Sequence, residues 1–519
     1  MTKSQKLRKN MSFRLQLLPE KDLVFGNNEE EKDPRRGLTH FGPYRYSSET
    51  PNLDKIKVGI IGDKTTLEKA KQIISMIQKE IKPHESNAWL YPDYPGISTK
   101  SKFNCSLEIS KTWEQTITIT ELDALTKIID VNERIGKAVE LYLSKINNIL
   151  DEDNLPDVIL CTLPKVIEEH CGISERTRGA KTPKPTELEK QVQEFKQQNQ
   201  KFLTEWGVVA GTVDIERPKG YDFRNALKGK LMSHKSAKPI QILRETSCDA
   251  ILEYEPTKKS TRQEPASFAW NLSTALFYKA NGKPWRLAKL RDDTCYVGIS
   301  FYQDKLSYNR DIQTSMAQVF THTGDGLVLR GTEVYVDERT KEAHLSEKQA
   351  KELLADAINR YSTRAGRTPS RVVIHKKTLF SDAEKKGFSE AIGSLKKDFV
   401  TINKRNRGIR FMRGGSYPVL RGTLITLTNE EHILYTSGYT PRIRTYPGHS
   451  IPRPLYITHI GDSEIYEICD EIMGLTKLNW NTTAFSTYLP ITLEFSERVG
   501  RVLSELKEKQ LQNHYKFYM

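Results

Sequence analysis

The sequence predicts an α/β protein made of two successive blocks in which strands and helices alternate. The first block begins with a continuous apolar strand at 56–63, followed by a segment with apolar residues at helical spacing. The second begins near 293, with a strand at 295–302 that leads into further strands, an amphipathic helix and a buried strand. This alternation is typical of sheets whose faces are covered by helices.

In the first block, the strand IKVGIIGD precedes the helix-like segment TTLEKAKQIISMIQKEI, and a second strand–helix unit is predicted at 157–170. Residues 176–204 are charged and rich in Gln, and we expect a loop running into a helix. Strand character returns at 206–213. The earlier stretch 33–44 contains Asp33-Pro34 and Phe41-Gly42-Pro43, and it is predicted to be extended chain with tight turns.

In the second block, the element order is typical of an RNase H-like fold, although element order alone is weak evidence of function. Two strands in a meander precede a helix that ends at Gly366, and a buried strand, a helix and another strand follow. A hairpin-like pair and two helices close the chain. The predicted strands are 316–322, 326–336, 371–377, 398–404, 423–428 and 432–438. The predicted helices are 346–366, 382–394, 463–476 and 490–509.

The charge balance favours a polyanionic partner. Among 519 residues, 80 Lys and Arg against 66 Asp and Glu leave a net charge of +14, and each phosphate contact would release condensed counterions. No apolar run reaches the roughly 20 residues of a membrane span, and the N-terminus lacks the apolar core of a signal peptide. No phosphate loop of the GxxxxGK[ST] type occurs. The six cysteines contain no CxxC pair, so we expect buried thiols in a cytoplasmic protein.

A group of cations and one amide in the first block suits a phosphate pocket. Arg224 and Lys228 are four residues apart and would share one helix face. Gln241 follows in a strand-like segment, and Lys279 lies near the end of a helix that stops at 281–282. Brought together, they would offer a guanidinium fork, two point charges and an amide donor. The alternative is a solvated basic helix face, which charge spacing alone favours.

These segments resemble the MID domain of short prokaryotic Argonautes. The resemblance rests on Arg-x-x-x-Lys, Pro-x-Gln-Ile-x-Arg-Glu and Tyr-Lys-Ala-x-Gly-x-Pro-Trp. It implies that Arg224, Lys228, Gln241 and Lys279 hold the 5′-phosphate of a guide strand, with Arg224 replacing the family's usual His or Tyr. It also implies that the C-terminus at Met519 folds back near the guide 5′ end, where its carboxylate would help to hold Mg²⁺.

The resemblance extends over nearly the whole chain. Phe25-Gly26 is similar to the family's opening strand region, Ile60-Ile61-Gly62 to the first MID strand, and 475–481 to the last part of PIWI. It implies an N-terminal segment packing on PIWI (1–50), a Rossmann-like MID domain (51–290) and an RNase H-like PIWI domain (291–519). No PAZ domain is expected.

The second block departs from the acidic tetrad of a cleaving PIWI domain, which holds two divalent metals on the scissile phosphate. Where the family has Gly-Ile-Asp, this chain has Gly-Ile-Ser, ending at Ser300. Where the family has His-Arg-Asp-Gly, this chain has His-Lys-Lys-Thr, with Lys377 at the Asp position. Glu497 matches the fourth ligand. An ammonium at a metal-ligand position would repel the metal, so we expect no cleavage.

Basic residues of the second block are expected to contact a nucleic-acid backbone instead. The segment 403–415, NKRNRGIRFMRGG, interleaves Arg and Lys with Phe and Gly, which suits sequence-independent binding. As a bare charge run it would be only a solvated loop. The expected backbone contacts are Lys376, Lys377, Lys404, Arg405, Arg407 and Arg410.

The resemblance implies a sensor. It would bind a guide RNA, pair it with single-stranded target DNA, and activate a separate APAZ-domain protein that carries a TIR, sirtuin-like or nuclease effector, in defence against plasmids and phage. One alternative is an RNase H-like nuclease that uses other carboxylates, such as Asp337, Glu338 and Glu497. A second is a stand-alone nucleic-acid-binding module without an effector.

Overall fold

The computed structural model describes most of the chain. The described residues are 13–45, 53–172, 183–205, 222–255, 263–291, 293–303, 312–320, 326–339, 342–403, 410–415, 418–448, 450–506, 512 and 514–519. The strand predicted at 206–213 lies outside them.

The first block forms a four-stranded parallel sheet in the order β5-β4-β6-β7. Helices pack on both of its faces. One face belongs to the main apolar core, which continues into the second block, and the other buries a separate cluster; α2 contacts α8 and α4 contacts α7. The predicted strand–helix units are confirmed as β4–α2 and β6–α5. The strands are β4 (Lys55–Gly62), β5 (Ser106–Thr116), β6 (Val158–Leu163) and β7 (Ile240–Arg244). The helices are α2 (Lys64–Ile77), α3 (Ile119–Thr126), α4 (Val131–Leu150), α5 (Lys165–His170), α6 (Glu187–Glu205), α7 (Phe223–Met232), α8 (Glu245–Leu252) and α9 (Pro265–Lys279).

The second block forms the larger part of a nine-stranded mixed sheet, ordered β1-β16-β17-β18-β15-β14-β9-β10-β11. Its parallel centre is β9-β14-β15, and the predicted meander and hairpin are confirmed as β9–β10–β11 and β16–β17. The strands from this block are β9 (Thr294–Gln303), β10 (Ile312–Phe320), β11 (Gly326–Glu333), β14 (Arg371–Lys376), β15 (Lys396–Asn403), β16 (Thr423–Thr426), β17 (Glu431–Leu434) and β18 (Leu455–Gly461). A separate pair joins β12 (Tyr335–Val336) to β13 (Ala343–His344).

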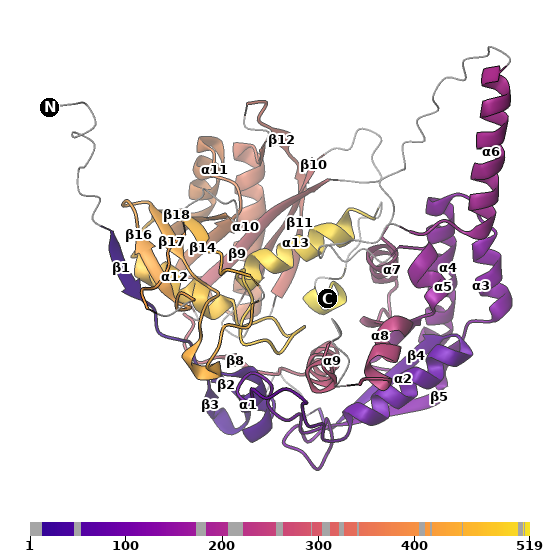
Figure 1. Ribbon diagram of the computed structural model, residues 1–519. Coiled ribbons are helices and arrows are strands. Elements are labelled where there is room, and N and C mark those ends of the chain that lie inside the picture. Colours follow the sequence, from indigo (N-terminus) through magenta and orange to yellow (C-terminus); the bar gives the residue numbers. More distant parts are fainter. Residues whose placement is uncertain are drawn as a thin grey trace.

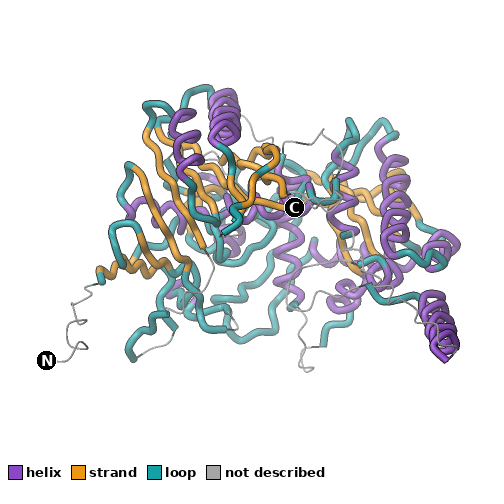
Figure 2. Tube along the Cα trace, turned by 90° about the horizontal axis from the view of Figure 1, so that it is seen from above, coloured by secondary structure: helices purple, strands orange, loops and turns teal. Residues whose placement is uncertain are grey.

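Helices cover the two faces of this sheet, with α10 and α11 behind it and α12 and α13 in front in the view of Figure 1. Their bounds are α10 (Glu347–Ala365), α11 (Asp382–Ile392), α12 (Ile465–Leu475) and α13 (Ile491–Leu503). Helix α10 begins with a capping box at Ser346 and ends at Gly366, whose φ of 68° suits glycine. The two sheets lie at opposite ends of the molecule, and the C-terminus lies between them in both views (Figures 1 and 2).

The N-terminal segment joins the two blocks. Its first strand, β1 (Arg14–Leu17), pairs antiparallel with β16 and so extends the large sheet. A small sheet then combines β2 (Leu23–Val24), β3 (Glu30–Glu31) and β8 (Arg286–Leu287). The prediction of extended chain at 33–44 is partly wrong, because α1 (Pro34–His40) is helical. Asp33 caps it by accepting hydrogen bonds from the N–H groups of Arg35 and Arg36.

All six cysteines are free and buried, as predicted. Among the helices of the described residues, none is long and apolar enough to cross a membrane.

Candidate nucleic-acid interface

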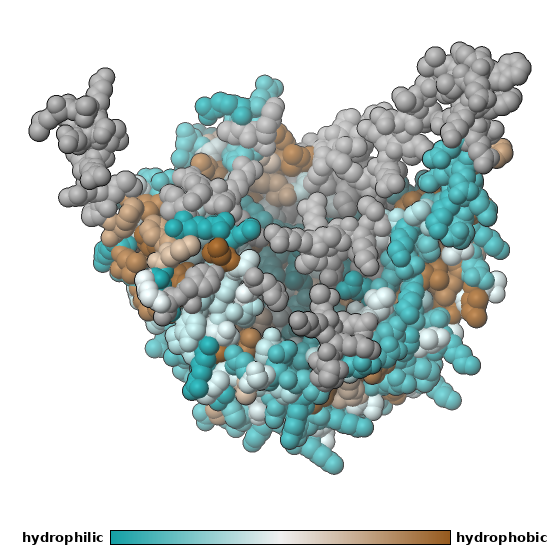
Figure 3. Space-filling view, in the orientation of Figure 1, coloured by the Kyte–Doolittle hydropathy of each residue, from teal (hydrophilic) through white to brown (hydrophobic). Residues whose placement is uncertain are grey.

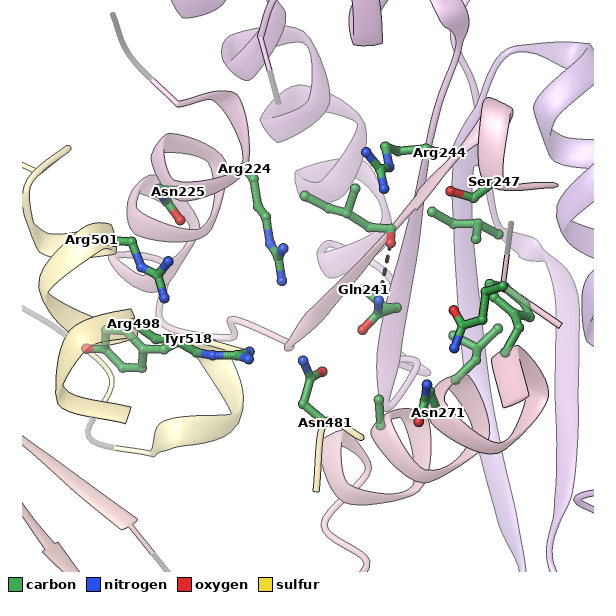
Figure 4. A pocket seen from close by; sticks show the side chains of 16 residues that line it. Arg224, Asn225, Gln241, Arg244, Ser247, Asn271, Asn481, Arg498, Arg501 and Tyr518 are labelled. Atoms are coloured by element: carbon green, nitrogen blue, oxygen red, sulfur yellow. Dashed lines mark hydrogen bonds between the residues drawn. The ribbon is translucent and has the colours of Figure 1, made fainter. Parts of the chain in front are cut away.

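A polar cavity of 480 Å³ lies where the two blocks meet (Figure 4). Its walls come from α7, β7, α8 and α9 of the first block, from α13 of the second, and from the C-terminal residues. No Asp or Glu side chain is among the described residues that line it. The lining residues are Arg224, Asn225, Gln241, Ile242, Leu243, Arg244, Ser247, Gln263, Phe268, Asn271, Leu272, Ala275, Asn481, Arg498, Arg501 and Tyr518.

Two of the four predicted phosphate ligands line this cavity. Arg224 extends from the first turn of α7, which begins after Asp222 accepts a hydrogen bond from the N–H of Asn225. Gln241 is the second residue of β7. In the close view, the guanidinium groups of Arg224 and Arg498 point toward the space beside Gln241 (Figure 4).

The other two predicted ligands, Lys228 and Lys279, lie behind the cavity wall with 2% and 1% of their surface exposed. The ammonium of Lys279 donates to the carbonyl of Ile240 at 2.9 Å and to Oε1 of Gln241 at 2.5 Å. Lys279 therefore fixes the amide of Gln241 and orients it beside the cavity. The NH₂ group of that amide donates to the carbonyl of Ile242 at 3.2 Å, so both ends of the amide are held.

The charges at this site repel one another. Burial lowers the pKa of Lys228 well below its usual value, and the nearby charges of Arg224, Lys279 and Arg498 lower it further. Burial likewise lowers the pKa of Lys279, again with Arg224 and Arg498 contributing. Carboxylates offset this only in part: Asp222 acts on Lys228, and Glu494 pairs with Arg498 at 3.2 Å. Such a group of cations is stabilised by a bound anion.

The C-terminal residues close one side of the cavity. Tyr518 lines it, and its hydroxyl donates to the carbonyl of Gln512 at 3.0 Å. Met519 is buried, with 1% of its surface exposed. Arginines and amides line the cavity, with no Asp or Glu side chain among the described lining residues, and further cations lie behind it. The predicted Mg²⁺ therefore depends on the C-terminal carboxylate of Met519 and stays a prediction. A phosphate would find its counter-charge in the guanidinium groups.

The three positions of the predicted degenerate cleavage site come from β9, the end of β14, and α13. Lys376 is paired with Ile299, so the next residues along the two parallel strands are Lys377 and Ser300. The ammonium of Lys377 forms an ion pair with Glu497 of α13. Asp337 and Glu338 follow β12, and no group of three or more His, Cys, Asp or Glu able to hold a metal occurs within the described residues.

Gly298 allows α13 to approach this strand closely. A Cβ atom at Gly298 would lie 2.2 Å from the carbonyl oxygen of Thr492, which is backbone and cannot yield easily. The hydroxyl of Thr492 also hydrogen-bonds His375 Nδ1 at 2.8 Å. This packing positions α13, which carries both Glu497 and the cavity residue Arg498.

Lys376 does not lie at a surface where a nucleic-acid backbone could reach it, so its predicted role is corrected. Its side chain is fully buried, and its ammonium donates to both carboxylate oxygens of Glu384 at 2.6 Å. The rings of Phe301 and Phe380 lie 5.3 and 5.4 Å away. Lys376 therefore stabilises the interior of the second block.

The remaining predicted backbone contacts are distributed differently. Lys377 is 35% exposed and Arg410 lies on the surface. Lys404, Arg405 and Arg407 lie outside the described residues.

Several cavity residues were not predicted. Arg498 and Arg501 are three apart on α13, a spacing that places them on one helix face. That spacing is a local signal, but nothing in the sequence places α13 against α7. Asn271 and Asn481 lie on segments that are 210 residues apart and meet only in the fold; the side chain of Asn271 accepts from the N–H of Thr483 at 2.8 Å.

The solved structures that this chain resembles include Argonautes. The Clostridium butyricum Argonaute bound to a guide DNA and a 19-mer target DNA superposes with a TM-score of 0.60 at 15% identity, over 97% of this chain and 54% of that chain. The Marinitoga piezophila Argonaute in complex with 5′ OH guide RNA superposes with a TM-score of 0.52 at 13% identity, over 99% of this chain and 60% of that chain. The chain has an Argonaute-like fold. Its Rossmann-like and RNase H-like blocks match the MID and PIWI parts of that fold.

The A. aeolicus Argonaute gives a TM-score of 0.52 at 14% identity, over 96% of this chain and 54% of that one. The chain thus spans a little over half the length of the Argonautes it resembles. No protein-family profile matches the sequence, and no curated protein matches it.

Proposed function

We propose that this Argonaute-like chain is a guide-dependent sensor of nucleic acid. It binds a guide RNA by its 5′-phosphate and pairs the guide with complementary single-stranded DNA without cutting it. The observation that carries the proposal is the cavity at the junction of the blocks, where Arg224 and Arg498 converge in front of the buried Lys228 and Lys279. A terminal phosphate carries two negative charges and three acceptor oxygens, which suit such a group.

The absence of cleavage is part of the same proposal. Two-metal hydrolysis needs carboxylates around the scissile phosphate, and here Glu497 is already paired with the ammonium of Lys377. We further propose that target binding activates a cytoplasmic partner, an APAZ-domain protein with a TIR, sirtuin-like or nuclease effector, in defence against plasmids or phage.

Guide binding by the full chain provides the first test, with 5′-phosphorylated and 5′-hydroxyl RNA of one sequence. Arg224→Ala is expected to weaken binding of the phosphorylated guide about tenfold, since charge-assisted hydrogen bonds contribute about 1.5–3 kcal/mol. Lys230→Ala, at an exposed position of the same helix, is the matched control. Equal affinity for the 5′-phosphorylated and the 5′-hydroxyl guide would refute the proposal that this cavity binds a 5′-phosphate. Binding should persist in EDTA because the guanidinium groups supply the counter-charge of the phosphate. Loss of binding in EDTA would instead support the predicted Mg²⁺ at the C-terminal carboxylate.

The target strand gives the second readout. Guide-loaded protein is expected to retain labelled complementary single-stranded DNA uncut in Mn²⁺ or Mg²⁺. A cut at one defined position would instead establish a guide-dependent nuclease. Effector activation is tested separately, by adding the APAZ protein and asking whether its activity needs both guide and target.

A further inference from the structure

The outermost strand of the large sheet presents an apolar row to solvent. In the described residues β1 pairs with β16 on one side and with no strand on the other. Phe13, Leu15 and Leu17 are 45%, 66% and 54% exposed. Side chains two residues apart point to the same face of a strand, so the three form one row. Exposed apolar edge strands are a liability that proteins normally avoid.

This row continues a small apolar cluster on one face of the sheet. Leu15 is paired with Ile425, which packs with Val419, Ile433 and Tyr435 in a cluster separate from the main core. The ring of Phe13 meets that of Phe411 edge-on, with centroids 5.8 Å apart. Hydrophobic colour gathers on the flank of the molecule that carries β1 (Figure 3). The cluster thus ends in side chains that are only half covered.

A second cavity, of 490 Å³, lies where β1 ends. Leu17, Leu18, Leu420 and Pro441 give it apolar walls. Its cationic rim comes mainly from η2 (Pro441–Ile443) and the residue after it. The full lining is Leu17, Leu18, Pro19, Glu20, Lys32, Trp89, Leu420, Arg421, Thr440, Pro441, Arg442 and Arg444.

Arg444 is held in an unusual conformation at this rim. Its φ of 53° is left-handed, a conformation that non-glycine residues rarely adopt. The guanidinium lies over the ring of Trp89, 4.2 Å from the centroid, and makes no hydrogen bond or ion pair with any other described residue. By contrast, Arg442 is already paired with Glu31. Arg444 therefore presents a stacked, pre-oriented fork whose donors face the cavity rim and solvent.

We propose that β1 and this cavity bind an extended, acidic peptide segment of a partner protein. The peptide main chain adds a strand to the free edge of β1, and its alternate apolar side chains cover Leu15 and Leu17. A carboxylate beyond the last apolar residue accepts hydrogen bonds from Arg444. The two-residue period of the apolar row matches a peptide and gives no advantage to a sugar–phosphate chain. The cationic rim selects for acidic residues.

This site is distinct from the guide cavity, so its test does not depend on guide binding. The probe is a fluorescein-labelled ten-residue peptide of alternating Val and Thr that ends in two Glu, titrated with the full chain by fluorescence anisotropy. The matched probe ends in two Lys. We expect the acidic peptide to bind about tenfold more tightly, because hydrogen bonds between a guanidinium and a carboxylate are stronger than those between neutral groups.

Two variants locate the contact. Arg444→Asn removes the guanidinium but tolerates the left-handed backbone, and it is expected to abolish the preference for the acidic peptide. Leu15→Thr keeps the strand propensity of β1 and is expected to weaken the binding of both peptides. Lys348→Asn removes one charge at a side chain that is 85% exposed on α10 and serves as the control. All three variants should bind guide RNA as the unchanged protein does.

Hydrogen exchange gives a readout specific to strand addition. Amides of β1 that face away from β16 should gain protection when the acidic peptide is bound. Equal affinity for the two peptides, unchanged binding by Arg444→Asn, or peptide binding without protection of β1 would each overturn the proposal. Binding of a ten-nucleotide oligo-dT that is lost in Arg444→Asn would assign the site to nucleic acid instead.

Discussion

Replacing Lys376 with methionine is expected to destabilise the protein by about 3–5 kcal/mol, because it leaves the buried carboxylate of Glu384 without its cation. Burial alone would raise the pKa of Glu384, but the Lys376 ammonium and the N–H groups of Ser381 and Leu345 outweigh it and lower that pKa. Glu384 therefore stays charged with 0% of its surface exposed. Without Lys376, either the charge is stranded or a proton must be taken up.

A double variant separates the charge from the packing. In Lys376→Met with Glu384→Gln, no charge remains buried, and Gln can still accept from the N–H of Leu345. We expect a loss well below that of the single variant, measured as the midpoint of thermal unfolding. The single change should lower Tm by roughly 10 °C. Lys348→Met on exposed α10 should change stability by no more than about 0.5 kcal/mol. A single variant as stable as this control would show that the pair contributes nothing.

The misplacement of Lys376 shows what the sequence could and could not provide. Successive residues of a strand point to opposite faces. Lys376 and Lys377, adjacent at the end of a buried strand, therefore could not both face one groove. The alternation was readable in advance. The partner Glu384 was not, because it lies in α11, and its contact with β14 depends on how the helix packs.

The helix α1 was missed although local sequence signals for it were present. Asp33-Pro34 is a capping residue followed by proline at the first helical position, which predicts a helix start. Glycine and proline around 37–43 favoured turns instead, and the fold resolved the conflict as α1. The alternating blocks were predictable because their apolar periodicity is local. The polar cavity between the blocks was only half predictable, because Arg498 meets Arg224 there only through the packing of α13 against α7.

Lys228→Met is expected to change stability and phosphate binding in opposite directions. Replacing a buried charge that lacks sufficient counter-charge by a side chain of similar volume should stabilise the free protein by about 1–3 kcal/mol. The same change removes a cation behind the cavity and should weaken binding of a 5′-phosphorylated guide by about tenfold to a hundredfold. Binding of the 5′-hydroxyl guide should change much less. Thermal unfolding with and without each guide measures both effects.

The pH dependence follows from the lowered pKa of Lys228. The unfolded chain binds a proton at this lysine below about pH 10.4. The folded chain does so only at lower pH, because burial and the charges of Arg224, Lys279 and Arg498 oppose it. Between those two pKa values the unfolded state holds more protons, so stability falls as pH falls. The Tm advantage of Lys228→Met should therefore be absent near pH 11 and grow toward neutral pH.

A bound phosphate should reduce or reverse the Tm advantage of Lys228→Met over the unchanged protein. Its negative charge favours the protonated lysine, and a ligand that binds only the folded state stabilises it by RT ln(1 + [L]/Kd). A phosphorylated guide should thus raise the Tm of the unchanged protein by more than it raises that of Lys228→Met, although the unchanged protein has the lower Tm without guide. If Lys228→Met were less stable than the unchanged protein at neutral pH, the charge of Lys228 would already be compensated by groups of the fold. An anion in the cavity would then not be required to stabilise that charge.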